Sequence, residues 1–136
     1  MKKIRFGAGK WNGYGGKVDA GESNEEAAAR ELFEESGIAT NPSELKKIAD
    51  VQFYFKDKPM FQCHAYIALE WENEPIESDE MFPEWFSLDA LPLDKMWVSD
   101  SLWLLDALAG YPQRGTVHFN ENGSVVETSE FQPADF

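Results

Sequence analysis

The chain has 136 residues, enough for one domain with a substantial core and too few for two domains of typical size. Its 43% hydrophobic and 14% aromatic residues exclude an intrinsically disordered composition. With 25 acidic residues against 12 lysines and arginines, the formal net charge is −13, so we expect neither a nucleic-acid polymer nor an anionic membrane as a partner. A small phosphorylated ligand is compatible with this charge if carboxylates hold a divalent cation.

The cysteine content and the N-terminal residues bear on the cellular compartment. Cys63 is the single cysteine, so no disulfide within the chain is expected. Residues 1–7 contain no apolar run of the kind that signal peptides have, and no segment reaches transmembrane length. We therefore expect a cytoplasmic, monomeric protein with a single domain over residues 1–136.

The predicted elements begin with a loop and a helix. Residues 6–16 hold many of the ten glycines, which favours a loop with short strand pieces. Ser23 followed three residues later by Glu26 is a capping box, and Gly37 is typical of the residue just beyond a helix C-terminus. The sequence therefore predicts a helix over residues 24–36.

Two strands are predicted next. Residues 51–55 and 61–71 are rich in aromatic and β-branched side chains. The run Lys56-Asp57-Lys58-Pro59 between them favours a turn. Residues 84–87 are expected to add a short strand.

A second helix is predicted over residues 100–109. Leucines recur there at helical spacing. Ser99 or Asp100 is expected to cap its start, and Gly110 is expected to end it.

The last predicted element is a hairpin. Residues 116–119 and 124–128 flank Asn120-Glu121-Asn122-Gly123, a run that favours a tight turn. Together with the two helices, these strands predict an α+β fold with helices packed on a mixed sheet. This fold class alone indicates no function.

The predicted first helix gathers Glu31, Glu34 and Glu35 within an arc of roughly 100°. Like charges this close repel each other, so a compensating positive group is expected. Mg²⁺ takes oxygen ligands and shares phosphate oxygens, which suits such a cluster. Arg30 can hold one carboxylate in place, and Glu22 at the helix start could pair with it. On charge alone, a solvated glutamate-rich surface is the more common explanation.

The segment from Gly16 to Ile38 matches a known motif. The pattern is G-x5-E-x7-R-E-U-x-E-E-x-G-U, where U is an aliphatic residue. The fixed positions are all matched, by Gly16, Glu22, Arg30, Glu31, Leu32, Glu34, Glu35, Gly37 and Ile38. The chain is therefore identified as a member of the Nudix hydrolase superfamily. The resemblance implies the Nudix fold, a mixed β-sheet sandwiched between α-helices, and Mg²⁺-dependent hydrolysis of a nucleoside diphosphate linked to another group.

The resemblance also implies roles within the box. Glu31, Glu34 and Glu35 are expected to be the catalytic metal ligands, with the backbone carbonyl of Gly15 beside them and Arg30 orienting a glutamate. Mg²⁺, or Mn²⁺ as a substitute, would neutralise pyrophosphate oxygens and activate a water. Which carboxylate acts as the general base stays open.

Several runs outside the box are similar to the Nudix hydrolases of oxidised purine nucleoside triphosphates, such as 8-oxo-dGTP and 2-hydroxy-dATP. These runs are residues 6–18, 77–81, 85–86, 96–97 and 100–101. The similarity implies that the products are a nucleoside monophosphate and pyrophosphate. Such an activity sanitises the nucleotide pool.

By this resemblance, Asn12 and Asp100 would hydrogen-bond the purine edge and Trp97 would stack on the base. Glu80 would join the metal shell. Further substrate contacts are expected at Lys2, Tyr14, Gly15, Gly16, Lys17 and Ser99. From the residues alone, Trp97 could equally be core and Asn12 a turn residue. Asp100 could equally be a helix cap, and Glu80 a surface charge.

Two departures from the family pattern limit these expectations. The family has two adjacent aspartates where this chain has Ser99 and Asp100, and since Ser99 carries no charge, base preference stays open. The family also begins with a strand that precedes the region matching residues 1–3. If Met1 is the true start, we expect the sheet to lack that first strand, although a misplaced start or a fragment is the simpler explanation.

Two alternatives stay open for the function. One is the same chemistry on another nucleotide, namely a methylated or ordinary purine triphosphate, ADP-ribose or a dinucleoside polyphosphate. The other is a nucleotide-binding module whose catalysis is impaired. The complete set of box glutamates argues against the second alternative.

Overall fold

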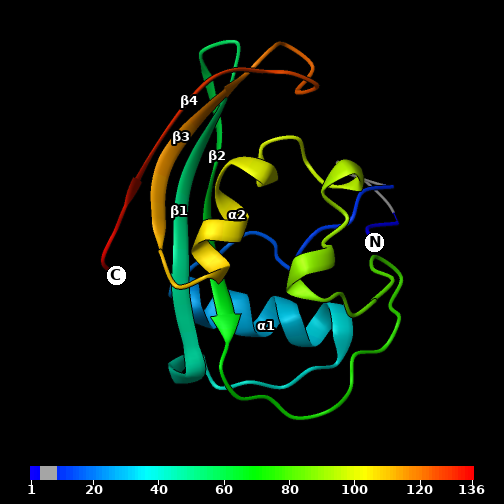
Figure 1. Ribbon diagram of the computed structural model, residues 1–136. Coiled ribbons are helices and arrows are strands. Elements are labelled where there is room, and N and C mark those ends of the chain that lie inside the picture. Colours follow the sequence, from blue (N-terminus) through cyan, green and yellow to red (C-terminus); the bar gives the residue numbers. More distant parts are fainter. Residues whose placement is uncertain (4–8) are drawn as a thin grey trace. The chain divides into compact units, whose positions relative to one another are not determined.

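The computed structural model describes residues 1–3 and 9–136, and these residues form two compact units. The first unit comprises residues 1–46 and 66–96, and the second comprises residues 47–65 and 97–136. The helices are α1 (Asn24–Ser36) and α2 (Asp100–Leu108), and the strands are β1 (Leu45–Phe55), β2 (Lys58–Ala68), β3 (Gln113–Phe119) and β4 (Val126–Pro133) (Figure 1). That residues 1–136 are one domain stays a prediction.

Helix α1 of the first unit begins and ends where the sequence predicts. The Ser23 hydroxyl accepts a hydrogen bond from the Glu26 amide at 3.1 Å, and the Glu26 carboxylate accepts one from the Ser23 amide at 3.0 Å. Gly37 ends the helix with a φ of 78°, a left-handed conformation that favours glycine. The capping box and the C-terminal glycine are therefore both confirmed.

Residues 72–76 are tied to the C-terminal end of α1. The Ile76 amide donates to the Ser36 carbonyl at 2.8 Å, and the Asn73 side-chain amide donates to the Gly37 carbonyl at 3.1 Å. Ala39 and Glu72 form an isolated antiparallel bridge. These bonds satisfy carbonyl groups that a helix end leaves without partners.

The predicted strand over residues 84–87 is wrong, since these residues have an irregular backbone. Their aromatic content suggested a strand, but the ring of Phe86 packs edge-to-face on Trp11, with centroids 4.9 Å apart. Ser87 begins a short 3₁₀ turn instead. Aromatic packing, and not pairing with a neighbouring strand, accounts for the composition of this segment.

The opening loop is confirmed over the residues that the structure describes. Residues 9–16 contain no strand, and Lys2 forms an isolated antiparallel bridge with Met81. The Trp11 amide donates to the Lys95 carbonyl at 2.8 Å. Phe6, Gly7 and Ala8 of the predicted loop lie outside the described residues.

The four strands form one mixed sheet in the order β2-β1-β3-β4 (Figure 1). Strands β1 and β3 pair in parallel, with Val51 opposite Gly115, and β3 pairs antiparallel with β4. Lys56 and Asp57 alone connect β1 to β2, with φ of 49° and 64°. Two helices and a mixed sheet confirm the predicted α+β class.

The strands are longer than predicted or shifted along the chain. β1 begins at Leu45 and not at residue 51, and β2 ends at Ala68 and not at residue 71. β3 begins at Gln113, which pairs with Ala49 of β1. Pairing between distant segments sets these bounds, and periodicity along the chain does not reveal it.

Helix α2 packs with the sheet of the second unit. Val51, Val117 and Phe119 are almost fully buried, and Trp103 and Ala107 of α2 are buried too. The rings of Trp97 and Phe119 meet edge-on at 6.1 Å. The helix ends at Leu108, one residue earlier than predicted, and Gly110 follows with a φ of 102°. Over the residues that the structure describes, no helix is both long enough and apolar enough to cross a membrane.

Candidate active site

Arg30 is the centre of a network of carboxylates on α1 and in the loop just before it. Its guanidinium binds Glu22 with two hydrogen bonds, from Nε to Oε2 at 2.7 Å and from Nη2 to Oε1 at 3.0 Å. Nη1 donates to Glu31 at 2.9 Å and to Glu34 at 3.2 Å. The hydrogen bonds from Arg30 lower the pKa of Glu22, and those to Glu22 raise the pKa of Arg30. The arginine therefore orients three carboxylates of the motif at once.

Glu35 lies beside Glu31 and is buried. It is 6% exposed, and burial, followed by a hydrogen bond with Glu31 and repulsion between the two groups, raises its pKa to about 7. The Gly15 amide donates to Glu35 and partly offsets the rise, and the charge of Glu80 adds to it. The raised pKa favours a protonated Glu35 carboxyl group, which can donate the hydrogen bond to Glu31, and a bound cation could replace that proton.

Gly16 provides the space for the Glu31 carboxyl group. A Cβ atom at this position would lie 2.5 Å from both Cδ and Oε1 of Glu31. A side chain here would displace the carboxyl group from Arg30 and Glu35. The motif glycine is therefore required by close approach, because no other residue leaves this space empty.

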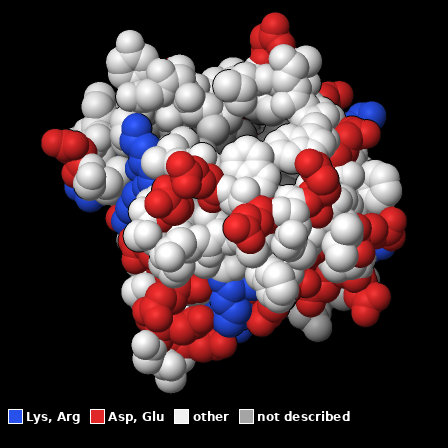
Figure 2. Space-filling view, turned by 90° about the horizontal axis from the view of Figure 1, so that it is seen from below, with Lys and Arg blue, Asp and Glu red and all other residues white. Residues whose placement is uncertain are grey.

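The three glutamates predicted as metal ligands are not equivalent. The Glu34 side chain is 55% exposed and is held by Arg30, whereas Glu31 is 16% exposed. Within residues 1–3 and 9–136, no three His, Cys, Asp or Glu side chains are arranged to hold a metal ion. The donor set nevertheless fits a hard divalent cation, since Glu31, Glu35 and Glu80 are neighbouring carboxylates whose repulsion raises the pKa of Glu35. On the face that Figure 2 shows, acidic side chains cover more of the surface than basic ones do.

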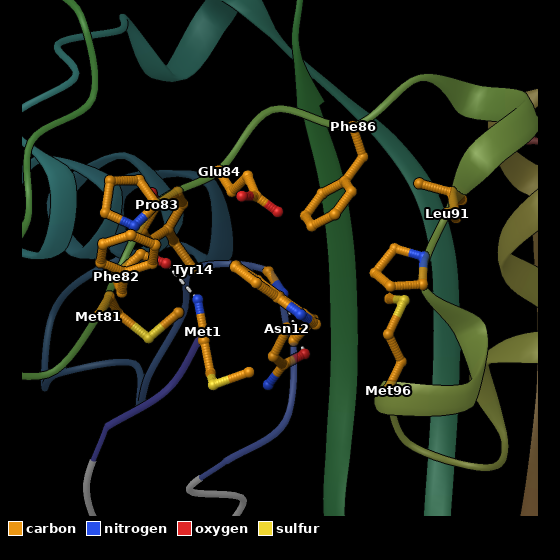
Figure 3. A pocket seen from close by; sticks show the side chains of 13 residues that line it. Met1, Asn12, Tyr14, Met81, Phe82, Pro83, Glu84, Phe86, Leu91 and Met96 are labelled. Atoms are coloured by element: carbon orange, nitrogen blue, oxygen red, sulfur yellow. Dashed lines mark hydrogen bonds between the residues drawn. The ribbon is translucent and has the colours of Figure 1, made fainter.

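A pocket of about 180 Å³ in the first unit is lined mainly by aromatic and apolar side chains. In Figure 3, Met81 and Phe82 lie on one side of the cavity and Leu91 and Met96 on the opposite side. Tyr14 also lines it, and burial followed by the charge of Glu35 raises the Tyr14 pKa. Tyr14 is thus a lining residue of the pocket that feels the charge of Glu35.

The predicted loop residues are distributed around this pocket. Asn12 lines it, and its side-chain oxygen accepts a hydrogen bond from the Gly13 amide at 3.0 Å. The Lys17 carbonyl accepts from Arg30 at 3.0 Å, and the Lys2 amide donates to the Lys10 carbonyl at 3.1 Å. The structure thus brings Asn12 and Tyr14 to the pocket and Lys17 to the arginine network.

The remaining predicted residues lie at the start of α2 in the second unit. Asp100 is 8% exposed, and burial raises its pKa to about 6 despite a hydrogen bond from the Trp97 amide. Ser99 takes the N-cap position, as predicted, but its side chain makes no capping bond. The Leu102 amide donates to the Ser99 backbone carbonyl at 3.0 Å instead. Asn12 belongs to the other unit, so a base site shared by these residues stays a prediction.

Sequence reasoning missed two tryptophans. Trp11 forms an aromatic wall of the pocket with Phe86, and Trp103 is buried in α2. The spacing of Trp103 from Ser99, four residues along a predicted helix, places both on one helix face. This four-residue spacing is the feature of the sequence that could have pointed to Trp103, and the structure buries both residues.

Comparison with known proteins shows the family. The NUDIX domain family matches residues 1–107, so the chain belongs to this family. It is 50% identical over 128 residues to the oxidized purine nucleoside triphosphate hydrolase of Danio rerio, covering 93% of this chain and 81% of that one. The Mus musculus protein of the same name is 45% identical over 130 residues, covering 95% and 82%.

A solved structure shows the same fold. The MutT protein of Bacillus halodurans matches with a TM-score of 0.76 at 24% identity, covering 93% of this chain and 85% of that chain. The predictions of a Nudix hydrolase and of its fold are therefore confirmed.

Proposed function

We propose that the protein hydrolyses oxidised purine nucleoside triphosphates, such as 8-oxo-dGTP and 2-hydroxy-dATP, to the monophosphate and pyrophosphate. The observation that carries the proposal is the 50% identity over 128 residues with the Danio rerio oxidized purine nucleoside triphosphate hydrolase. The complete motif and its arginine-held carboxylates support the same reaction. In a cell this activity would remove damaged nucleotides from the precursor pool.

We further propose that Mg²⁺, with Mn²⁺ as a substitute, is held by Glu31, Glu34 and Glu35, with Glu80 and the Gly15 carbonyl nearby. The metal, when bound, supplies charge neutralisation for the pyrophosphate oxygens. Arg30 holds Glu31 and Glu34 in position through hydrogen bonds of 2.9 Å and 3.2 Å. The proton that Glu35 holds has to leave before a cation binds there.

We propose that the residues predicted to recognise the base are those of the opening loop and of the start of α2. Asn12 and Asp100 would bond the purine edge and Trp97 would stack on it, while the other substrate contacts are expected at Lys2, Tyr14, Gly15, Gly16, Lys17 and Ser99. A small nucleotide as the ligand and a monomeric, cytoplasmic protein without nucleic-acid or membrane partners complete the proposal. The net charge of −13 supports it, because polyanions are repelled.

The test is a substrate panel in the presence of Mg²⁺. We expect kcat/KM for 8-oxo-dGTP or 2-hydroxy-dATP to exceed that for dGTP and dATP by about 10-fold or more. Pyrophosphate and the nucleoside monophosphate should form in equal amounts. A preference for ADP-ribose or a dinucleoside polyphosphate would contradict the proposal and support the broader Nudix alternative.

A matched pair of variants tests whether the box carries the chemistry. Glu35→Gln keeps the shape of the side chain and removes its charge, so turnover should be nearly lost. Glu121→Gln changes an exposed carboxylate in the β3–β4 connection and should leave turnover unchanged. Nucleotide binding by the unaltered protein without any pyrophosphate release would support a binding module instead.

A further inference from the structure

Two tryptophan side chains of the first unit meet at the surface. The ring centroids of Trp71 and Trp85 lie 6.2 Å apart, and the ring planes are inclined by 33°. The two residues are 46% and 66% exposed. Single exposed apolar side chains are normal, but contiguous exposed rings are typical of a surface that another molecule covers. Neither tryptophan lines the pocket of the first unit.

The backbone on both sides of Trp71 is held by hydrogen bonds. The Ala39 amide donates to the Glu72 carbonyl at 3.0 Å, and the Glu72 amide donates to the Ala39 carbonyl at 2.8 Å. The Thr40 hydroxyl donates to the Glu70 carbonyl at 2.7 Å. Trp71 therefore projects from an anchored segment, although it lies outside the helices and strands.

Trp85 is positioned by the residue that follows it. The ring of Phe86 packs edge-to-face on Trp11, with centroids 4.9 Å apart, and both rings line the pocket. This packing fixes the segment to which Trp85 belongs. Because both tryptophans are attached to anchored backbone, little ordering is needed when a partner binds, which favours affinity.

The segment that holds the two tryptophans is acidic. Residues 59–94 contain no lysine or arginine. Glu70, Glu72 and Glu84 are direct neighbours of the tryptophans in the sequence, and all three are exposed. The face of an indole ring attracts a cation, and carboxylates close to the ring add to that attraction.

The charges decide which kind of molecule can cover these rings. Two copies of a chain with a net charge of −13 repel each other, and an anionic membrane is repelled for the same reason. A cationic partner is attracted instead. A guanidinium group can stack on an indole and bind a carboxylate, whereas the ammonium group of lysine is compact and more strongly hydrated. Arginine is therefore the side chain that fits this surface best.

We propose that Trp71 and Trp85, with Glu70, Glu72 and Glu84, form a docking surface for an arginine-containing basic segment of a partner protein. A guanidinium group stacks on an exposed indole there, and the glutamates attract the positive charge. None of these five residues is proposed to bind the metal or the nucleotide. The docking surface is therefore independent of the proposed function.

The test measures binding of a tetra-arginine peptide with blocked ends, by isothermal titration calorimetry. A blocked tetra-lysine peptide of the same charge is the comparison. The arginine peptide should bind about 10-fold more tightly, because guanidinium groups stack on indole rings. Equal affinity would show that net charge alone is recognised and would overturn the proposal, as would no measurable binding of the arginine peptide.

Tryptophan variants locate the binding. Trp71→Ala and Trp85→Ala should each weaken the arginine peptide by about 10-fold, because exposed rings of this kind dominate binding. Tyr111→Ala is the matched control, since it removes an aromatic side chain that is 65% exposed in the second unit, and affinity should not change. Unchanged affinity in both tryptophan variants would refute the assignment. Should Trp71→Ala fail to fold, the more exposed Trp85 still decides the question.

Charge variants separate local from diffuse attraction. Glu70→Gln combined with Glu72→Gln should weaken the arginine peptide by about 10-fold. Glu121→Gln combined with Glu127→Gln removes the same charge from two exposed positions in and after the β3–β4 connection, and it should have little effect. If both pairs weaken binding equally, the attraction is diffuse and the proposal is wrong.

Two further measurements cover the other possible occupants and the enzyme itself. Self-association, or binding to phosphatidylserine vesicles, that Trp85→Ala abolishes would assign the surface to a second copy or a membrane and would overturn the proposal. All these variants should hydrolyse nucleotides as fast as the unaltered protein does. A failure of the proposed function therefore leaves the peptide result interpretable, and a failure of docking leaves hydrolysis intact.

Discussion

Helix α1 and the first turn of α2 differ in how their polar side chains are paired. On α1, one guanidinium binds Glu22, Glu31 and Glu34, and the Glu34 side chain is 55% exposed. At the start of α2, Ser99 and Trp103 are buried without partners among the described residues. The first region holds its charged groups in one hydrogen-bond network, whereas the second has two donors without a partner among residues 1–3 and 9–136.

This difference separates two tasks that one enzyme needs. A cluster of carboxylates held in place by one arginine can exchange a proton for a cation without large rearrangement. A buried region with unpaired donors instead discriminates between ligands, because each donor that stays without an acceptor costs binding free energy there. We therefore expect changes on α1 to affect the rate of hydrolysis for every substrate, and changes at α2 to affect the choice of base.

The largest expected effect is that of Glu31→Gln, which removes a carboxylate that contacts both Arg30 and Glu35. We expect kcat with Mg²⁺ to fall by about 100- to 1000-fold for 8-oxo-dGTP and dGTP alike, because metal charge stabilisation contributes several kcal/mol. Steady-state rates of pyrophosphate release measure this. If kcat fell for only one of the two nucleotides, the proposed division of tasks between α1 and the start of α2 would be contradicted.

Arg30→Lys should have the next largest effect, because lysine keeps the charge and loses the fork that binds Glu22 in two places. Apparent Mg²⁺ affinity should fall by about 10- to 100-fold, as is typical when a group that orients metal ligands is replaced. A magnesium titration of the activity gives the value. Unchanged affinity would show that Arg30 does not position Glu31.

Gly16→Ala places a Cβ atom where the Glu31 carboxyl group now lies, 2.5 Å from its Cδ. The end of this side chain can move, so the fold should survive while Mg²⁺ affinity falls by about 10-fold. Gly13→Ala is the matched control, because a Cβ there meets nothing within 4 Å. If both variants behave alike in the titration, the close approach at Gly16 is irrelevant to metal binding.

The smallest effect concerns the pH dependence of stability. Burial raises the Asp100 pKa from 3.8 to about 6, so the folded state holds this proton more firmly than the unfolded state does. The stabilising contribution is complete below pH 3.8 and is lost as the pH rises through about 6. Asp100→Asn should remove most of this decline, as measured by urea unfolding at several pH values. Parallel curves for the two proteins would contradict the assignment.

Local signals predicted the first helix and its motif accurately. Ser23, Glu26 and Gly37 interact with residues close to them in the chain. Their spacing is therefore enough to predict both helix caps. The same holds for Arg30 and Glu34, which meet because they are four residues apart on a helix. Family membership followed from these positions for the same reason.

Features that depend on distant segments were predicted less well. Residues 84–87 have the composition of a strand, yet Phe86 packs on Trp11, far away in the sequence. Strand β1 begins at Leu45, well before the aromatic run that suggested it, and it pairs in parallel with β3. Such bounds follow from partners that a single stretch of sequence does not contain.

The sequence by itself determined the α+β class, helix α1 with its caps, and the set of glutamates that defines the family, because each depends on short-range spacing. The tertiary structure alone decided which polar side chains are buried. It buried Glu35 and Asp100 and raised their pKa values, and it left Ser99 and Trp103 unpaired among the described residues. Burial results from packing between segments that are distant in the sequence, so spacing along the chain does not predict it.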